Sequence, residues 1–274
     1  MWTCENRPKY NRDKLRYPSD LTDEEWSHVA PLIRPAKHGG RKRKVDVREV
    51  VNGIMYVLST GCQWRYVPKD LPPKSTLFDY FDLWNYDGTL ENVHHALYVK
   101  CREAVEREAS PTACIIDSQS VKGAEKGGAA STRAATTRAR RSKARSVTVG
   151  LLLQAVVHPA DIQDRDGGVV VLSTLFGLYP FLSKLFADGG CQGPQFCKAQ
   201  KKALPHLATE IVKRSDCATG FEVLPGRWVV ERTFAWLGRC RRLAKDFENL
   251  SRNALAFLRL ASIRLMLRKL CSNK

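Results

Sequence analysis

The stretch from Gly127 to Ser146 limits most strongly how this chain can fold, because it cannot contribute to a hydrophobic core. It reads GGAASTRAATTRARRSKARS, with no Leu, Ile, Val, Met, aromatic or acidic residue and with six Arg or Lys residues among its twenty. This composition is typical of a disordered linker or of a basic arm that binds nucleic acid. The stretch lies in mid-chain between two strongly apolar segments, which must therefore supply the cores.

The overall charge indicates what kind of partner the chain binds. Its 45 Lys and Arg residues exceed its 28 Asp and Glu residues, which gives a net charge of +17. Such a surplus favours a polyanionic partner, nucleic acid first and an acidic membrane surface second. The membrane is the weaker alternative, because the N-terminal sequence lacks the apolar run of a signal peptide and the apolar segment 254–270 contains four basic residues.

The cysteines and histidines do not follow the spacing of a metal finger. None of the nine cysteines forms a Cys-x-x-Cys pair, and none of the six histidines lies at zinc-finger spacing from such a pair. We therefore expect reduced thiols in a cytoplasmic, nucleoid-associated protein, and we expect no organic cofactor.

Residues 18–108 are expected to form a small helical domain after a polar tail of residues 1–17. Sequence signals mark the helix ends: a capping box at Thr22 and Glu25, a terminating glycine at Gly61, an N-terminal cap at Ser75, and a fourth helix from about Leu90 to Glu108.

A basic run precedes the second of these helices and consists of Arg41, Lys42, Arg43 and Lys44. Short helices joined by turns, with basic residues at a helix entrance, suit a helix-turn-helix module that binds DNA through these four residues. A plain helical bundle with a solvated basic loop fits the pattern equally well, so both interpretations stay open.

Residues 109–274 alternate between strand and helix patterns, which predicts an α/β domain. Short apolar runs typical of strands are 113–117, 147–158, 185–188 and 210–213, and helical patterns are 165–182, 194–202 and 228–244.

Three carboxylates stand out in this second region. Asp117 and Asp188 follow strand patterns, and Glu231 lies in the first turn of a predicted helix. Three such oxygen donors suit hard divalent cations, and two ions about 3.5–4 Å apart can clamp both oxygens of a phosphoryl displacement. Each acid also has a simpler interpretation as a turn, cap or ion-pair residue. The acids of the segment 161–166 are interpreted as loop and helix-cap residues.

Several blocks of sequence carry a specific resemblance. They are, in chain order, IIDSQSVK from Ile115 to Lys122, HPADIQDRDG from His158 to Gly167, ADGG from Ala187 to Gly190, and RWVVERTFAWL from Arg227 to Leu237. Together they closely resemble bacterial insertion-sequence transposases of the IS-five group, in the wider IS-four-like DDE class. The front region resembles the same group through LTDEEW, GCQWR and DGT, so the resemblance covers nearly the whole chain.

The resemblance implies an α/β catalytic domain of the RNase H-like type, preceded by the helical domain. Its catalytic and metal-binding triad is Asp117, Asp188 and Glu231. These residues would bind two Mg²⁺ ions, with Mn²⁺ as a substitute, and would support DNA strand cleavage followed by strand transfer. The implied partner is double-stranded DNA, both the element's terminal inverted repeats and the target, bound by a homo-oligomer.

Further residues are implied to contact DNA. Arg227 matches the Arg of the group's Tyr-Arg-Glu-Lys signature, whereas Leu224 and Gly238 depart from its Tyr and its basic position. Arg242, eleven residues after Glu231, is the expected substitute on the same helix face. The remaining basic residues expected to contact DNA are Lys122, Arg232 and Arg239.

The resemblance also offers an explanation of the unusual stretch. The group carries a segment beginning Tyr-Asp-Ala-Gly-Lys-Lys here, and codons compatible with Thr136 to Thr148 spell such a segment one base earlier. We therefore interpret Ala129 to about Thr148 as a compensated double frameshift within an aberrant segment, 127–148. The alternative is a genuine basic arm. On the frameshift hypothesis the strand beside Asp117 is lost or shortened, and the protein binds DNA but transposes poorly.

Two other classes of protein remain as alternatives. One is a DNA-binding protein without chemistry, either a decayed copy or a regulator. The other is an RNase H-fold nuclease that cuts RNA or structured DNA.

Overall fold

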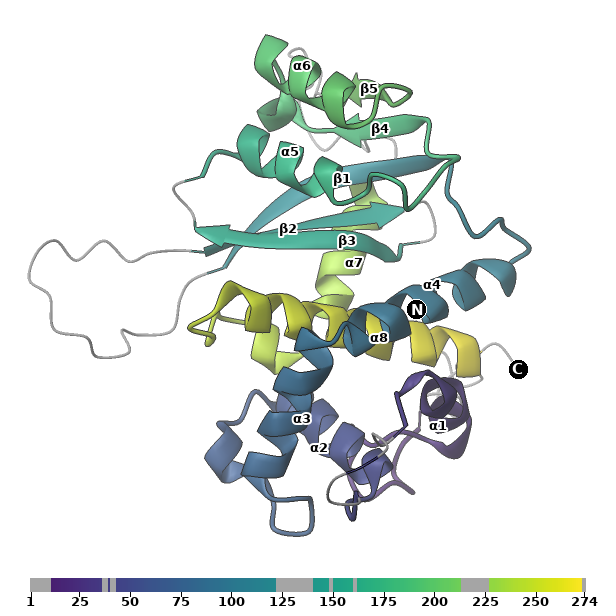
Figure 1. Ribbon diagram of the computed structural model, residues 1–274, viewed down its shortest axis with the longest axis vertical. Helices are drawn as coiled ribbons and strands as arrows, with labels where there is room; N and C mark the ends of the chain where they lie inside the picture. The colour runs from purple at the N-terminus through teal and green to yellow at the C-terminus, as the bar shows by residue number, and fades with distance from the viewer. Residues whose placement is uncertain are drawn as a thin grey trace, which may run out of the picture. The chain divides into compact units, whose positions relative to one another are not determined.

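The structure is a computed structural model that describes residues 11–35, 39, 43–121, 140–147, 150–159, 162–212 and 227–272. The chain divides into two compact units (Figure 1). The first consists of Met1–Val105, Arg239–Leu243 and Ala256–Lys274, and the second consists of Glu106–Gly238 and Ala244–Leu255. This partition differs from the expected linear boundary near residue 108, because two C-terminal segments pack with the N-terminal helices.

The first unit is helical. Its elements are α1 (Asp23–Val29), η2 (Ala30–Leu32), α2 (Val47–Thr60), η3 (Trp64–Tyr66), α3 (Lys74–Tyr86), α4 (Thr89–Glu103), η5 (Arg241–Leu243) and most of α8 (Ser251–Ser272). Its largest fully buried side chains are Ile54, Met55, Leu58, Leu77, Phe81, Leu97, Tyr98 and Phe257. Phe81 of α3 stacks on Phe257 of α8 with 4.7 Å between ring centroids, so the C-terminal helix completes this core.

Local sequence signals explain most of the helix ends in this unit. Thr22 and Glu25 form the predicted capping box, in which each side chain accepts a hydrogen bond from the other's backbone N–H. Gly61 ends α2 with φ +69°, as predicted. The predicted cap at Ser75 is wrong, because α3 begins at Lys74 and its N-cap residue, Pro73, makes no side-chain hydrogen bond. α4 ends five residues earlier than expected.

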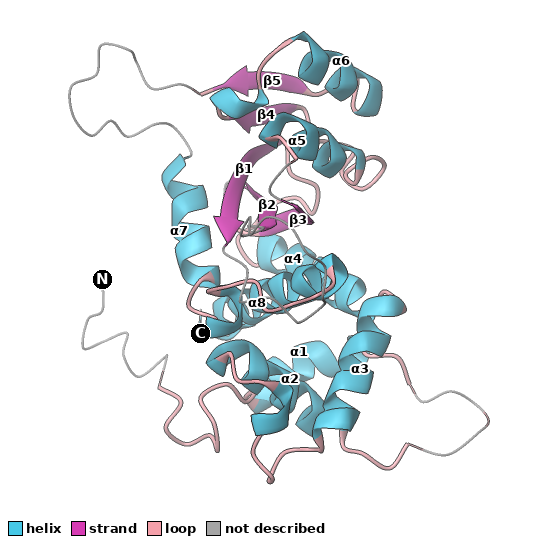
Figure 2. Cartoon of the chain, turned by 90° about the vertical axis from the view of Figure 1, so that its left-hand side faces the viewer, coloured by secondary structure: helices cyan, strands magenta, loops and turns pink. Residues whose placement is uncertain are grey.

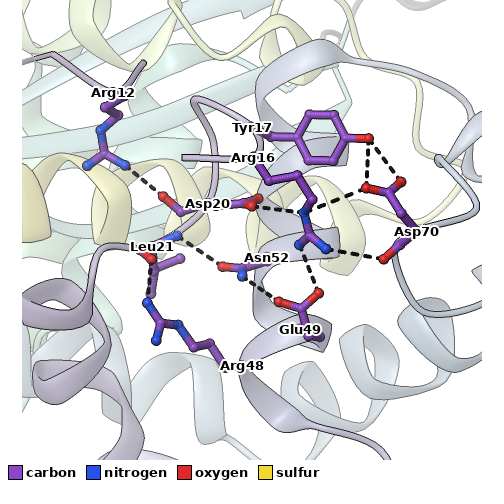
Figure 3. Close-up of polar contacts among 9 residues, drawn as sticks. All are labelled: Arg12, Arg16, Tyr17, Asp20, Leu21, Arg48, Glu49, Asn52 and Asp70. Atoms are coloured by element: carbon purple, nitrogen blue, oxygen red, sulfur yellow. Dashed lines mark hydrogen bonds and ion pairs between the residues drawn. The ribbon is translucent and has the colours of Figure 1, made fainter. Parts of the chain in front are cut away.

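A polar network fastens the segment before α1 to the rest of the first unit (Figure 3). The Arg16 guanidinium lies at its centre, 3.3 Å from Asp20 and 2.8 Å from Glu49, and it donates to the Asp70 carbonyl at 3.2 Å. The Tyr17 hydroxyl donates to the Asp70 carboxylate at 2.9 Å. Burial raises the pKa of Asp20, although the neighbouring guanidinium acts in the opposite direction. The network therefore orders a segment that the sequence pattern presented only as a polar tail.

The second unit is built on a five-stranded sheet with the order β3-β2-β1-β4-β5. Its elements are β1 (Ala113–Val121), β2 (Arg140–Val147), β3 (Leu152–Pro159), α5 (Asp164–Ser173), β4 (Lys184–Ala187), η4 (Gly189–Cys191), α6 (Pro194–Ala203), β5 (Ala208–Ile211) and α7 (Arg227–Leu237). The pairs β1–β2 and β2–β3 are antiparallel, whereas β1–β4 and β4–β5 are parallel. Figure 2 shows α5 and α6 on one face of the sheet and α7 on the other.

The strand beside Asp117 is present, so the expectation that it is lost or shortened is wrong. β2 pairs with β1 along its whole length, from Cys114↔Val147 to Val121↔Arg140, and its other edge pairs with β3. A ladder is made by main-chain N–H and C=O groups, which Arg, Lys, Ser and Ala carry as well as Val or Ile. The earlier part of the unusual stretch, residues 127–139, lies outside the described residues.

Two predicted helices are shorter than their patterns suggested. α5 ends at Ser173 rather than at residue 182, and it is followed by tight turns. α7 ends at Leu237 rather than at residue 244, and the separate short helix η5 follows it. Among the described residues, no helix combines the length and the apolar character needed to cross a membrane.

Candidate active site

The strand register brings two of the three predicted catalytic acids to neighbouring positions. Ile116 of β1 pairs with Ala187 of β4 in the parallel ladder, and the next residues are Asp117 and Asp188. Adjacent strands lie about 4.8 Å apart, so these two residues start side by side at one level of the sheet. Neither strand pattern alone predicts this register.

Alternation along the strands places both aspartates on the face that α7 covers. Cys114, Ile116 and Ala187 are almost fully buried, and Ile116 approaches Gly168 of α5. Because successive side chains of a strand point to opposite faces, Asp117 faces away from α5. Asp188 continues β4 in extended conformation, with φ −79° and ψ 175°, and therefore faces the same way. α7 packs against β1 and β2 on this face (Figure 2).

Backbone groups orient the two carboxylates. Asp117 is half-buried, and one of its oxygens accepts a hydrogen bond from the Ser118 N–H at 2.9 Å. Asp188 is exposed, and one of its oxygens accepts from the Gly190 N–H at 3.1 Å, which caps η4. Asp188 therefore does serve as a turn cap, which was its simpler interpretation. A carboxylate has two oxygens and several lone pairs, so this role leaves acceptor capacity for a cation.

The structure does not bring Glu231 into a metal-binding group with these aspartates. The buried residues of α7 are Val229, Thr233 and Leu237, which form one stripe along the helix. Glu231 is exposed and lies nearly opposite that stripe, because two residues correspond to about 200° of helical rotation. Among the described residues, no three His, Cys, Asp or Glu side chains are close enough together to hold a metal ion.

The donor set suits a divalent cation only in part. Paired carboxylates are the oxygen ligands that Mg²⁺ and Mn²⁺ prefer, and Mg²⁺ commonly retains several waters beside one or two carboxylates. Asp117 and Asp188 meet that requirement by position. A third protein ligand needs a different placement of Glu231.

A stacked array of side chains on α7 was not predicted from the sequence. The Arg232 guanidinium lies 4.3 Å from the ring centroid of Trp228 and 4.9 Å from that of Trp236. The signal was present as spacing, because these residues recur every four positions and so share one side of a helix. These ring contacts fix the direction of the guanidinium N–H groups, and because Arg232 is exposed they are accessible to a phosphate. Arg227 is the first residue of α7.

Arg242 does not occupy the position expected of it. The expected helical phase with Glu231 fails because α7 ends at Leu237, and Arg242 belongs to η5 in the first unit. It is only 8% exposed, donates a hydrogen bond to the Cys62 carbonyl at 3.1 Å, and lies over the Phe257 ring. These contacts are those of a core residue rather than of a DNA contact. Arg239 of the same segment is exposed.

The other predicted DNA contacts are only partly described. Arg41, Lys42 and Lys122 lie outside the described residues. Arg43 donates to the Arg34 carbonyl at 3.4 Å and lies over the Tyr80 ring of α3, at 5.6 Å from its centroid. Lys44 is exposed.

The outer face of α3 bears on the helix-turn-helix interpretation. Its exposed residues after Lys74 include one acid, Asp79, and three apolar residues, Phe78, Leu83 and Tyr86. Asp82 is half-buried, and no Lys or Arg follows Lys74 in this helix. Contacts with a phosphate backbone come mainly from basic and hydroxyl groups. The basic run before α2 is therefore the better candidate for a DNA contact in this unit than the outer face of α3.

Comparison with known proteins adds an independent finding. Residues 108–266, more than half of the chain, match the family model described as "Transposase DDE domain". Residues 21–94 match a second model, described as "Putative transposase of IS4/5 family". The chain is also similar to the "Insertion element IS402 uncharacterized 16.2 kDa protein" of Burkholderia cepacia, with 31% identity over 108 residues, covering 37% of this chain and 72% of that protein. No solved structure matches the chain.

Proposed function

This chain belongs to the transposase DDE domain family, and from that premise we propose that it binds the ends of an insertion element and catalyses DNA strand cleavage and strand transfer. The observation that carries the proposal is the register Ile116↔Ala187, which sets Asp117 and Asp188 side by side on one face of the sheet. The strand order β3-β2-β1-β4-β5, with antiparallel strands on one side of β1 and parallel strands on the other, supports an RNase H-like architecture.

Asp117 and Asp188 would hold the metal, and Glu231 would supply a third carboxylate. A bound divalent ion lowers the pKa of a water molecule and offsets the charge that develops on the scissile phosphate. The two carboxylates would fix the position of the metal ion, and hydrogen bonds from backbone N–H groups keep the carboxylates oriented. Arg232, held between two indole rings, would grip a neighbouring phosphate and so set the position of the strand.

Glu231 can join the two aspartates only if α7 turns or shifts on the sheet. A DNA strand that binds Arg232, the next residue, more tightly when α7 is shifted would favour such a movement, because a ligand stabilises the state for which it has the higher affinity. The net charge of +17 supports a high but salt-sensitive affinity for the phosphate backbone of the DNA outside the site.

The test is cleavage of a duplex that carries the flanks of the gene by the purified full chain, in Mg²⁺ or Mn²⁺. We expect Asp117→Asn and Asp188→Asn each to reduce cleavage at least about a hundredfold while leaving DNA affinity unchanged. Asp166→Asn is the matched control, because Asp166 is an exposed acid of α5 that pairs with Arg165. Unaltered cleavage by both site variants would show that the aspartates are not the catalytic acids.

A catalytically impaired copy that only binds DNA is the second candidate. The observation in its favour is that the described residues contain no three-ligand metal group. The discriminating experiment replaces Ala129–Thr148 by the segment that the frameshift hypothesis assigns to the neighbouring reading frame. Cleavage that appears only after this repair would identify an impaired copy, whereas equal cleavage before and after it would exclude one.

A further inference from the structure

A turn-rich segment after α5 presents apolar side chains to solvent. Four residues of α5 and this segment have exposed apolar side chains, and we call them the apolar patch: Val170 at 48% exposure, Phe176 at 71%, Leu178 at 47% and Phe181 at 59%. Single exposed apolar residues are ordinary on protein surfaces, but several within twelve positions are not.

The segment that carries the patch is held firmly by its other side chains and its backbone. Leu175, Tyr179 and Leu182 alternate with the patch residues and are buried. Successive tight turns close with backbone hydrogen bonds of 3.1 to 3.3 Å, for example from the Leu178 N–H to the Leu175 carbonyl. The patch is therefore presented by a fixed scaffold, so its exposure does not come from a loose loop.

Charge indicates which partner can approach the patch. No charged residue occurs from Gly167 to Ser183, although 27% of the whole chain is charged and its net charge is +17. Two copies of such a chain repel each other over most of their surfaces, and this repulsion is weakest where both are uncharged. The segment from Gly167 to Ser183 itself offers nucleic acid no charged group, so the patch suits a second copy better than it suits DNA.

The size of the patch indicates how strong the contact is. Two largely exposed phenyl rings with Leu and Val side chains expose roughly 400 Å², since an aromatic side chain can bury about 150–250 Å². A stable interface needs about 800 Å² from each partner, so the patch is about half of what a permanent dimer requires. A contact of this size is adequate once two copies are bound to the same ligand, because their effective concentration is then on the order of mM.

We propose that the apolar patch is a self-association surface, through which two copies of this chain pair when both are bound to one DNA. This inference rests on the proposed function, which explains why two copies would come together on one DNA. The contact itself is isologous, with the phenyl rings of Phe176 and Phe181 meeting the same surface of the partner copy.

The experiment compares the full chain with the double variant Phe176→Asp/Phe181→Asp. Sedimentation equilibrium at elevated salt measures self-association of the free protein, and titration of a long duplex of arbitrary sequence measures cooperativity on DNA. We expect the variant to raise the dimer dissociation constant and to lower the cooperativity factor by at least about tenfold each, with unchanged affinity for a short single-site duplex. Each Asp also lowers the net positive charge, so simple relief of repulsion predicts the opposite change.

Tyr86→Asp is the control, because Tyr86 is an 83% exposed aromatic residue of the other unit and its substitution adds one negative charge, as each of the two patch substitutions does. Equal cooperativity of the wild type and the double variant on the long duplex would overturn the proposal. A melting temperature that falls by several degrees in the variant would also overturn it, because it would mean that the patch is covered within one chain. Asp117→Asn is expected to leave association unchanged, so a failure of the catalytic proposal would be seen separately.

Discussion

Replacing Arg242 by Ala separates a structural role from a DNA-binding role for this residue. The substitution removes a hydrogen bond from a charged donor to the Cys62 carbonyl and the stacking of the guanidinium over Phe257. A hydrogen bond of this kind contributes about 1.5–3 kcal/mol, and a shielded cation–π contact about 0.5–2 kcal/mol. We therefore expect the free energy of unfolding of the first unit to fall by about 3 kcal/mol, since the side chain is only 8% exposed and water cannot replace these contacts.

Thermal denaturation followed by circular dichroism measures this loss. For a unit of this size, about 3 kcal/mol corresponds to a decrease in melting temperature of roughly 10 °C. The dependence of DNA affinity on salt, measured well below the transition, should keep its wild-type slope. Arg239→Ala is the matched control, because Arg239 is exposed in the same segment. We expect little change in its stability, and a slope lowered by about 0.9 because one phosphate contact is lost.

The reverse pattern would refute this reasoning. Suppose that Arg242→Ala keeps the wild-type melting temperature and lowers the slope of log DNA affinity against log salt concentration by about one. The guanidinium then contacts DNA and is not buried against Phe257.

Two further predictions concern the first unit. In urea denaturation, Gly61→Ala should destabilise this unit more than Gly88→Ala. Both glycines have positive φ, which costs alanine about 1–2 kcal/mol. A methyl group at Gly61 would also lie 3.1 Å from the backbone of Arg241, whereas nothing lies within 4 Å of a methyl group at Gly88. Equal losses would mean that the contact with Arg241 does not form. Burial lowers the pKa of His94 to about 3, so below pH 6.5 the unfolded chain takes up a proton that the folded chain cannot. The contribution of neutral His94 to the free energy of unfolding is therefore present above pH 6.5 and is lost as the pH falls towards 3. Between pH 7 and pH 5 this contributes about 2 kcal/mol of lost stability, which His94→Gln should abolish when unfolding free energies are compared at the two pH values.

Signals that act over a few residues could be read from the sequence. The capping box of Thr22 and Glu25 and the glycine that ends α2 were predicted because their partners lie within one or two turns. The end of α7 was not predicted, because the apolar pattern continues beyond Leu237 while the chain leaves the helix to join another core. Tertiary packing overrides a local pattern at such a point.

The candidate site divides in the same way. The sequence placed Asp117 and Asp188 at strand ends, but only the pairing of β1 with β4 shows that they are neighbours, and pairing depends on residues some seventy positions apart. The direction of Glu231 depends on which side of α7 meets the sheet, and the stripe of Val229, Thr233 and Leu237 decides that. The stacking of Arg232 between two indoles could have been found from its four-residue spacing alone.

The composition of the helical unit has a consequence for anyone who cuts this chain into fragments. Its polypeptide departs after Val105, returns for Arg239–Leu243, departs again and returns at Ala256, so the sheet-containing unit is an insertion within it. A fragment that stops near residue 105 would lack the ring of Phe257 and leave Phe81 without its stacking partner. A fragment that starts there would carry the apolar side of α8 with nothing to cover it. We expect neither piece to remain soluble by itself, and a working truncation would need to keep both returning segments.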